Sequence, residues 1–218
     1  FNLTIAPNKK IAIVGKSGQG KSTIFNLLTR IFDPTSGEIL IDGINIKDLT
    51  EESLRNNISI IRQEPFIFNR TIKENFEILN PKIELKEIRK YCKIAYLDDY
   101  IESLPKKYDT MLGEGGINLS GGQKQRLSIA RTLAKQSKMI LFDEATSALD
   151  NNSQEYIKKA IDSLVKDHTV IIVAHRLSTI EDADIIYVVD DGKIVSSGTH
   201  KELLNKSEIY KKLYNTEV

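Results

Sequence analysis

The sequence is poor in cysteine, in net charge and in long apolar runs, and each absence excludes a class of protein. Its one cysteine, Cys92, excludes an internal disulfide framework and a cysteine-based metal cluster. The formal net charge is only +1, so the strong basicity of a nucleic-acid footprint is absent and no nucleic-acid partner is expected. No apolar run approaches the roughly 18 residues of a membrane-spanning helix. We therefore expect a reduced domain, soluble by itself, in which Cys92 is buried or idle.

The chain has 218 residues, of which 40% are hydrophobic, and this suits one α/β domain with ample core. Residues 1–5 alternate apolar and polar side chains, like a strand that is already under way. This abrupt start suggests either an artificial chain boundary or a cut from something longer, in which case these residues would be its C-terminal part.

A glycine-rich turn follows the apolar run of residues 11–14 and matches the pattern GxxxxGK[S/T]. Such a turn points backbone N–H groups at an anion, Lys21 can reach the outer phosphates, and Ser22 offers a hydroxyl to magnesium. A helix that starts here adds the positive end of its dipole. The residues expected to hold the phosphates are Gly15, Lys16, Ser17, Gly18, Gln19, Gly20, Lys21, Ser22 and Thr23.

The alternative, a chance match, is weakened by the strand before the turn and by the apolar residues at helical spacing after it. These apolar residues are expected to belong to the core, not to a ligand site, and they are Ile24, Leu27, Leu28, Ile31 and Phe32.

The rest of the chain predicts an α/β fold with a mainly parallel sheet. Residues 37–43 indicate a short strand of a small antiparallel sheet, and residues 71–135 read mostly as helix, with Asn80-Pro81 as one helix start. The apolar runs 139–142 and 169–174 suit parallel strands buried on both faces. Residues 185–195 read as a hairpin, and a final helix starts at a capping box of Thr199 and Glu202.

A second candidate site begins at Leu119-Ser120-Gly121-Gly122-Gln123, which precedes a helical run. Ser120 and Gln123 form a capping box, so a bare helix start is one interpretation. However, adjacent glycines in a first turn cost helix stability, up to roughly 1 kcal/mol each against alanine. Exposed backbone at a positive helix end suits a second phosphate instead.

At this point the sequence resembles the ATP-binding cassette family, the nucleotide-binding domains of ABC transporters, whose signature reads LSGGQ. The resemblance covers nearly the whole chain. Besides the Walker A turn and the signature, residues 139–144 look like Walker B with its following glutamate, and residues 147–150 look like the D-loop. Gln63 is similar to the Q-loop glutamine and His175 to the switch histidine. The sequences of residues 63–68, 113–116 and 174–179 are similar to those of exporters that fuse this domain to their membrane helices.

The resemblance implies a P-loop NTPase core with an inserted helical subdomain and a small antiparallel β subdomain. The expected ATP-binding core is 1–63 and 138–218, and the helical subdomain is 64–137. Asp143 ends an apolar strand, where a carboxylate faces the ligand crevice, although it could simply cap the strand. The expected roles are catalysis for Lys21, Gln63, Glu144 and His175, magnesium binding for Ser22, Gln63 and Asp143, and nucleotide contacts for Ser120, Gly121, Gly122, Gln123 and Asp150.

Each of these roles has a plainer alternative. Glu144 could position or deprotonate the attacking water, or it could be a surface glutamate. His175 resembles the histidine that steadies the transition state, although a lone histidine is usually structural. The resemblance places the aromatic side chain that stacks on adenine upstream of Phe1. We therefore expect these residues to bind the phosphates of ATP, and to bind the adenine base more weakly than the family does.

In function, the resemblance implies an ATPase with ATP and Mg²⁺ as cofactors that powers export across a membrane. Its partners would be a second cassette, in a head-to-tail dimer around two ATP molecules, and a transmembrane domain that tethers it to the cytoplasmic face. The alternative is a nucleotide-binding but catalytically idle regulatory or assembly cassette. A relative that acts on DNA or ribosomes fits less well, because its long insertions are absent from these residues.

Overall fold

The computed structural model describes residues 1–143, 150–174 and 176–216. A six-stranded sheet runs through the described residues in the order β4-β5-β6-β1-β7-β8, and all its neighbouring pairs are parallel except β7 with β8. A separate pair, β2 with β3, is antiparallel. The strands are β1 (Lys10–Val14), β2 (Leu40–Ile41), β3 (Ile44–Asn45), β4 (Ile58–Ile61), β5 (Met139–Asp143), β6 (Thr169–Val173), β7 (Ile185–Asp190) and β8 (Lys193–Gly198). The predicted mainly parallel α/β fold with a small antiparallel sheet is confirmed.

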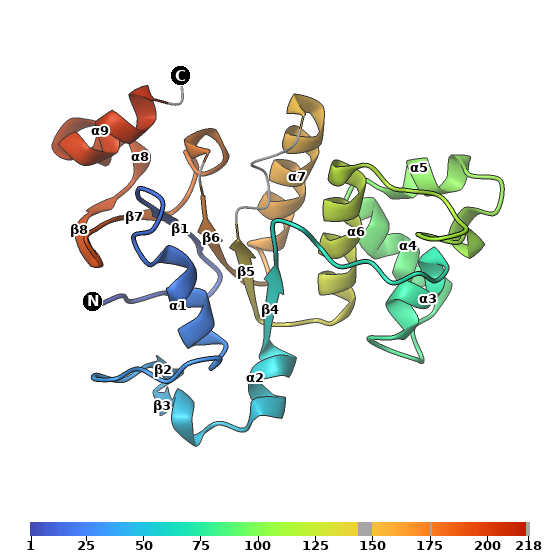
Figure 1. The fold of residues 1–218 in the computed structure, drawn as a ribbon, viewed down its shortest axis with the longest axis horizontal. Coiled ribbons are helices and arrows are strands. Elements are labelled where there is room, and N and C mark those ends of the chain that lie inside the picture. The colour runs from blue at the N-terminus through green and yellow to red at the C-terminus, as the bar shows by residue number, and fades with distance from the viewer. Residues whose placement is uncertain (144–149, 175, 217–218) are drawn as a thin grey trace.

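Helices cover both faces of the sheet, and a group of them stands beside it, on the right in Figure 1. The α-helices are α1 (Lys21–Leu28), α2 (Glu51–Asn57), α3 (Ile72–Glu77), α4 (Leu85–Ile94), α5 (Asp98–Ser103), α6 (Gly121–Ala134), α7 (Asn151–Leu164), α8 (His200–Lys206) and α9 (Glu208–Asn215). Short 3₁₀ turns are η1 (Ile46–Asp48), η2 (Lys107–Asp109) and η3 (Leu177–Thr179). No helix in the described ranges is long and apolar enough to cross a membrane.

The core lies on both faces because the buried strands are apolar over most of their length. Successive side chains of a strand point to opposite faces, so Ile11 and Ile13 join the cluster that contains Phe25 of α1, whereas Ala12 and Val14 join the cluster that contains α7. The second cluster continues into the helices beside the sheet, where Cys92 is fully buried. Burial raises the pKa of the Cys92 thiol to about 12, which keeps it protonated and inert, as expected.

Two predictions made from apolar patterns were wrong. Residues 1–6, all described, form no strand; Leu3 and Ile5 pack on the α1 side of the core, and the carbonyl of Thr4 accepts a 2.9 Å hydrogen bond from Tyr187 Oη. The alternation therefore reflects one-sided packing. Ile31 and Phe32 are not core, since α1 ends at Leu28 and both side chains are more than half exposed.

Two helix boundaries also differ from expectation. Asn80 does not cap a helix: its side chain accepts from the backbone N–H of Lys82 in a local turn, and α4 begins only after Glu84. The capping box of Thr199 is present, but the final helical stretch divides at Ser207, which ends α8 and caps α9. The predicted hairpin is confirmed as β7 and β8.

Candidate nucleotide-binding site

The carboxyl ends of four parallel strands bring the candidate residues to one edge of the sheet. Val173 of β6 pairs with both Ile13 and Asp143, so Asp143 and the turn after β1 lie at the same level. Gln63 follows β4, which pairs with β5 and ends beside Phe142. Parallel α/β sheets bind ligands at this edge. Glu144, His175 and residues 147–149 lie outside the described residues.

The glycine turn between β1 and α1 has the backbone shape of an anion cradle. Gly18 and Gly20 have φ angles of 79° and 84°, in the left-handed region that glycine adopts without strain. Gly20 also stands at the N-cap of α1, where it offers no side chain to the first N–H groups of the helix. These groups and the helix dipole therefore face whatever occupies the turn.

The turn is fastened to strand β7. A Cβ on Gly15 would lie 2.3 Å from the carbonyl oxygen of Val189, so only glycine fits there. The side-chain oxygen of Gln19 accepts a hydrogen bond from the backbone N–H of Asp191, in the β7–β8 turn. The sequence predicted that Gln19 contacts the phosphates. It did not predict the contact with Asp191, because the two residues are far apart in the chain.

The Lys21 side chain is buried at the start of α1 and lies inside the glycine turn. It is 4% exposed, and its ammonium donates to the carbonyls of Gly15 and Lys16, both at 2.7 Å. The burial of a lysine needs such partners. The ammonium is thus held inside the ring of glycine backbone, where it can neutralise a bound anion.

Oxygen atoms suited to a divalent cation meet beside the turn. Ser22 Oγ lies 3.5 Å from Asp143 Oδ1, and one comes from α1, the other from the end of β5. Among the described residues, no group of three or more His, Cys, Asp or Glu side chains could hold a metal ion. The pair fits Mg²⁺, which takes one or two protein oxygens and completes its shell with phosphates and water.

The signature residues begin α6 as predicted. Ser120 Oγ accepts from the backbone N–H of Gln123 at 3.2 Å, and the Gln123 side chain accepts from the Ser120 N–H at 2.8 Å. Ser120 and Gly121 are exposed. In Figure 1 this end of α6 lies toward the top right and the glycine turn toward the top left. The chain therefore does not bring its own signature to its own glycine turn.

Gly122 has a packing role that the sequence did not reveal. It is buried, and a Cβ there would lie 2.3 Å from Ser153 Oγ and 2.6 Å from Ser153 Cβ, on the first turn of α7. The side chain of Asp150 caps α7, because its oxygens accept from the backbone N–H of Ser153 at 2.9 Å and from Ser153 Oγ at 2.7 Å. These hydrogen bonds lower the pKa of Asp150. Asp150 and the signature helix thus meet through Ser153.

This contact predicts a suppressor. Gly122→Ala alone is expected to push α6 away from α7 and to lower ATPase activity by at least about tenfold, as misplacement near a reacting centre does. Adding Ser153→Gly removes both close atoms and leaves Ser153 Cα at 3.8 Å, an ordinary contact. Steady-state kinetics should show most of the activity restored in the double variant, with Ser153→Gly alone as control. A double variant as inactive as Gly122→Ala would mean that the nucleotide itself demands a bare glycine.

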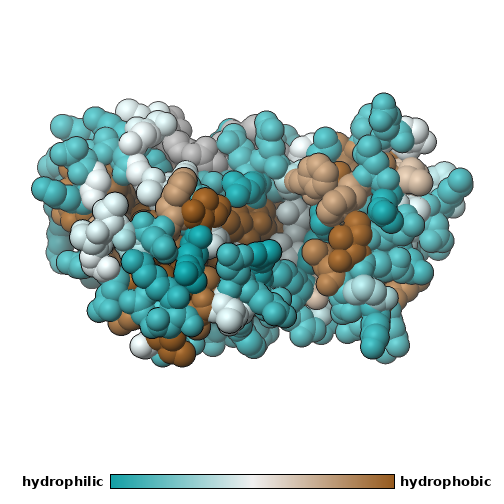
Figure 2. Space-filling model, turned by 60° about the horizontal axis from the view of Figure 1, so that its bottom comes forward, coloured by the Kyte–Doolittle hydropathy of each residue, from teal (hydrophilic) through white to brown (hydrophobic). Residues whose placement is uncertain are grey.

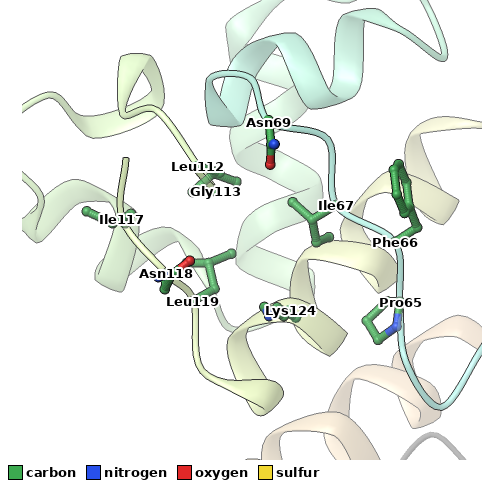
Figure 3. A pocket seen from close by; sticks show the side chains of 10 residues that line it. All are labelled: Pro65, Phe66, Ile67, Asn69, Leu112, Gly113, Ile117, Asn118, Leu119 and Lys124. Atoms are coloured by element: carbon green, nitrogen blue, oxygen red, sulfur yellow. The ribbon is translucent and has the colours of Figure 1, made fainter. Parts of the chain in front are cut away.

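A groove lies beside the candidate site, between the segment after Gln63, the loop before the signature and α6. Its cavity is about 270 Å³, and Figure 3 shows Ile67 and Asn69 pointing toward its centre while Phe66 turns away. Phe66 is 73% exposed. Figure 2 shows apolar surface gathered in separate patches on a mostly hydrophilic face. The residues that line the groove are Pro65, Phe66, Ile67, Asn69, Leu112, Gly113, Ile117, Asn118, Leu119 and Lys124.

Comparisons with known proteins agree with this geometry. The family model described as "ABC transporter" matches residues 1–147. Two proteins named as multidrug export ATP-binding/permease proteins, from Staphylococcus aureus strains bovine RF122 / ET3-1 and NCTC 8325 / PS 47, are each 50% identical over 217 residues, which is 100% of this chain and 38% of theirs. A bacterial Atm1-family ABC exporter with ATP bound superposes with a TM-score of 0.90 at 42% identity, over 98% of this chain and 37% of that one.

Proposed function

The chain belongs to the ABC transporter family, and from this premise we propose that it is the nucleotide-binding domain of an exporter, which binds ATP with Mg²⁺ and hydrolyses it. The chain spans 38% of the length of the staphylococcal relatives, so the activity of a whole transporter is part of the proposal. The observation that carries it is the buried Lys21 ammonium inside the glycine turn, at the same sheet edge as Ser22 and Asp143.

The residues of this edge divide the work of phosphoryl transfer. Lys21 and the backbone of the glycine turn hold the outer phosphates, and Ser22 and Asp143, with Gln63, would hold the cation. Bound Mg²⁺ neutralises charge that develops on the phosphates. Glu144 orients or deprotonates the attacking water, and His175 steadies the transferred phosphoryl group. Since this reaction depends on positioning and charge neutralisation, a rigid turn is what it needs.

A second copy or a similar cassette would complete each site. The γ-phosphate needs donors on the side away from Lys21, and the exposed N-terminus of α6 offers Ser120, Gly121 and backbone N–H groups. Because this end lies apart from the glycine turn, beyond α7 in Figure 1, a head-to-tail partner is the arrangement that satisfies both ends. Asp150 would lie at the same interface.

The same proposal divides the chain into two parts with different roles. Residues 1–63 and 138–218 form the ATP-binding core, and residues 64–137 form the helical subdomain that carries the signature. The groove beside Phe66 is suited to a helix end of a transmembrane domain, because it pairs the exposed Phe66 side chain with a cavity between two loops. That domain would hold the cassette at the cytoplasmic face of a membrane.

The proposal predicts that hydrolysis depends on association. The ATPase rate per chain should rise with protein concentration, because a lone cassette lacks the trans donors, and removal of Mg²⁺ with EDTA should abolish it. Phosphate release measured over a wide range of chain concentrations checks both. ATP binding with no turnover at any concentration would favour the idle regulatory cassette instead. A rate per chain that is independent of concentration would contradict the dimer.

A further inference from the structure

The side-chain amide of Gln125, on α6, is hydrogen-bonded to the main chain just after β4. Gln125 is 2% exposed, and its Nε2 donates to the carbonyls of Arg62 at 2.9 Å and of Gln63 at 3.0 Å. The segment that carries the candidate magnesium ligand Gln63 is therefore bonded to the helix that starts at the signature.

The orientation of this amide is fixed by its surroundings. Carbonyl oxygens only accept hydrogen bonds, so the NH₂ group of Gln125 must face Arg62 and Gln63. Its Oε1 is buried and has no hydrogen-bond partner within the part of the chain that the structure describes. An orphaned buried acceptor costs stability. Gln125 thus uses its donors on this segment at a cost that an apolar side chain of similar length would avoid.

The same helix holds the far end of the segment. Arg131 Nη1 donates to the carbonyl of Phe66 at 2.8 Å, and the guanidinium carbon lies 5.1 Å from the centre of the Phe68 ring. Residues 62–68 form no helix or strand, although all are described, and the side chain of Gln63 is exposed. The path of this main chain therefore depends on donors from α6 as well as on its links to β4 and α3.

We propose that Gln125 is a positioning residue, which ties Gln63 to the signature helix so that the two move as one body. The inference rests on the proposed function, since the place of Gln63 matters to a site that holds Mg²⁺ and ATP. When a partner's nucleotide engages Ser120 at the start of α6, the amide of Gln125 carries that displacement to Gln63 and so to the chain's own nucleotide. This side chain thereby contributes to a link between the two sites of a dimer.

A Gln125→Met substitution separates positioning from folding. It keeps the length of the side chain but removes both donors and the orphaned acceptor together, so removal of the unpaired oxygen offsets part of the cost of the two lost hydrogen bonds. Arg62 and Gln63 are exposed residues, so we expect water to reach their carbonyls once the Gln125 amide is gone. We expect the melting temperature to change by no more than about 4 °C. Gln136→Met is the matched control, because Gln136 is an exposed amide just after the other end of α6.

The test is a double-mutant cycle on the 218-residue chain, with kcat and the half-saturating Mg²⁺ concentration as readouts. Gln125→Met and Gln63→Ala should each lower kcat by about 10-fold to 100-fold and raise the Mg²⁺ requirement, while Gln136→Met should not. The double variant should be no worse than Gln63→Ala, because Gln125 acts through Gln63. Multiplied effects in the double variant, or wild-type kinetics in Gln125→Met, would overturn the proposal.

A second readout needs no activity. In the nucleotide-free chain, hydrogen exchange of the backbone amides of residues 63, 64 and 66–68 should become at least about tenfold faster in Gln125→Met and stay unchanged in Gln136→Met. Unchanged exchange in both would overturn the positioning role, whatever the chain hydrolyses. Faster exchange in a chain that shows no ATPase activity would support the role of Gln125 in placing Gln63 and count against the proposed function instead.

Discussion

Glu144→Gln is expected to lower kcat for ATP hydrolysis by about 10² to 10⁴, the contribution of a general base, while ATP still binds. The amide keeps the size of the side chain but cannot accept a proton from the attacking water. The binding elements that the structure describes, which are the glycine turn, Lys21, Ser22 and Asp143, are untouched by the change.

Single-turnover hydrolysis and ATP titration of the same variant separate chemistry from binding. Glu38→Gln, at an exposed position just before β2, is the matched control and should retain wild-type kinetics. Undiminished turnover in Glu144→Gln would remove the proposed base and leave the hydrolysis without the residue that activates water.

Lys21→Met should have an effect of similar size on kcat/KM, because it removes the buried ammonium that lies inside the turn. Loss of a single preorganised donor to developing charge costs about 10² to 10³ in rate, and here the weaker grip on ATP adds to it. Unlike Glu144→Gln, this variant should also bind ATP more weakly. Isothermal titration with ATP and Mg²⁺, together with steady-state kinetics, checks both parts.

Folding must be checked in the same variant. Lys21 donates to the carbonyls of Gly15 and Lys16, and methionine leaves these carbonyls without that donor, so the melting temperature is measured alongside. Lys47→Met, at an exposed position on η1, is the control for loss of one positive charge. A folded Lys21→Met chain with unchanged ATP affinity and turnover would show that the turn does not bind the phosphates.

Local rules predicted the parts of the fold that depend on neighbours in sequence. The β7–β8 hairpin follows from Asp191 and Gly192, whose positive φ angles a tight turn requires. The capping box at Ser120 follows from spacing, and the buried parallel strands follow from continuous apolar runs. The resemblance then supplied what spacing could not, namely which of these elements would form a site.

Contacts between distant segments were beyond the reach of the sequence. The alternation of residues 1–5 looks the same whether a strand pairs there or one face merely packs, and the helical spacing of Ile31 and Phe32 continues past the point where α1 ends. Gly122 was explained by a phosphate, because nothing in the sequence shows that Ser153 lies against it. The hydrogen bonds of Gln125 could not be predicted for the same reason, because the carbonyls that accept them lie about 60 positions earlier in the chain.

The central claim is that the phosphates of ATP lie between the glycine turn of one chain and the signature helix of another. The most direct test is a crystal structure of the Glu144→Gln chain with ATP and Mg²⁺. We predict the β- and γ-phosphates within hydrogen-bond distance of Lys21 Nζ, and the γ-phosphate also against Ser120 and the backbone N–H groups at the start of α6 of a second chain. A triphosphate bound away from Lys21, or fully enclosed by one chain, would contradict the account.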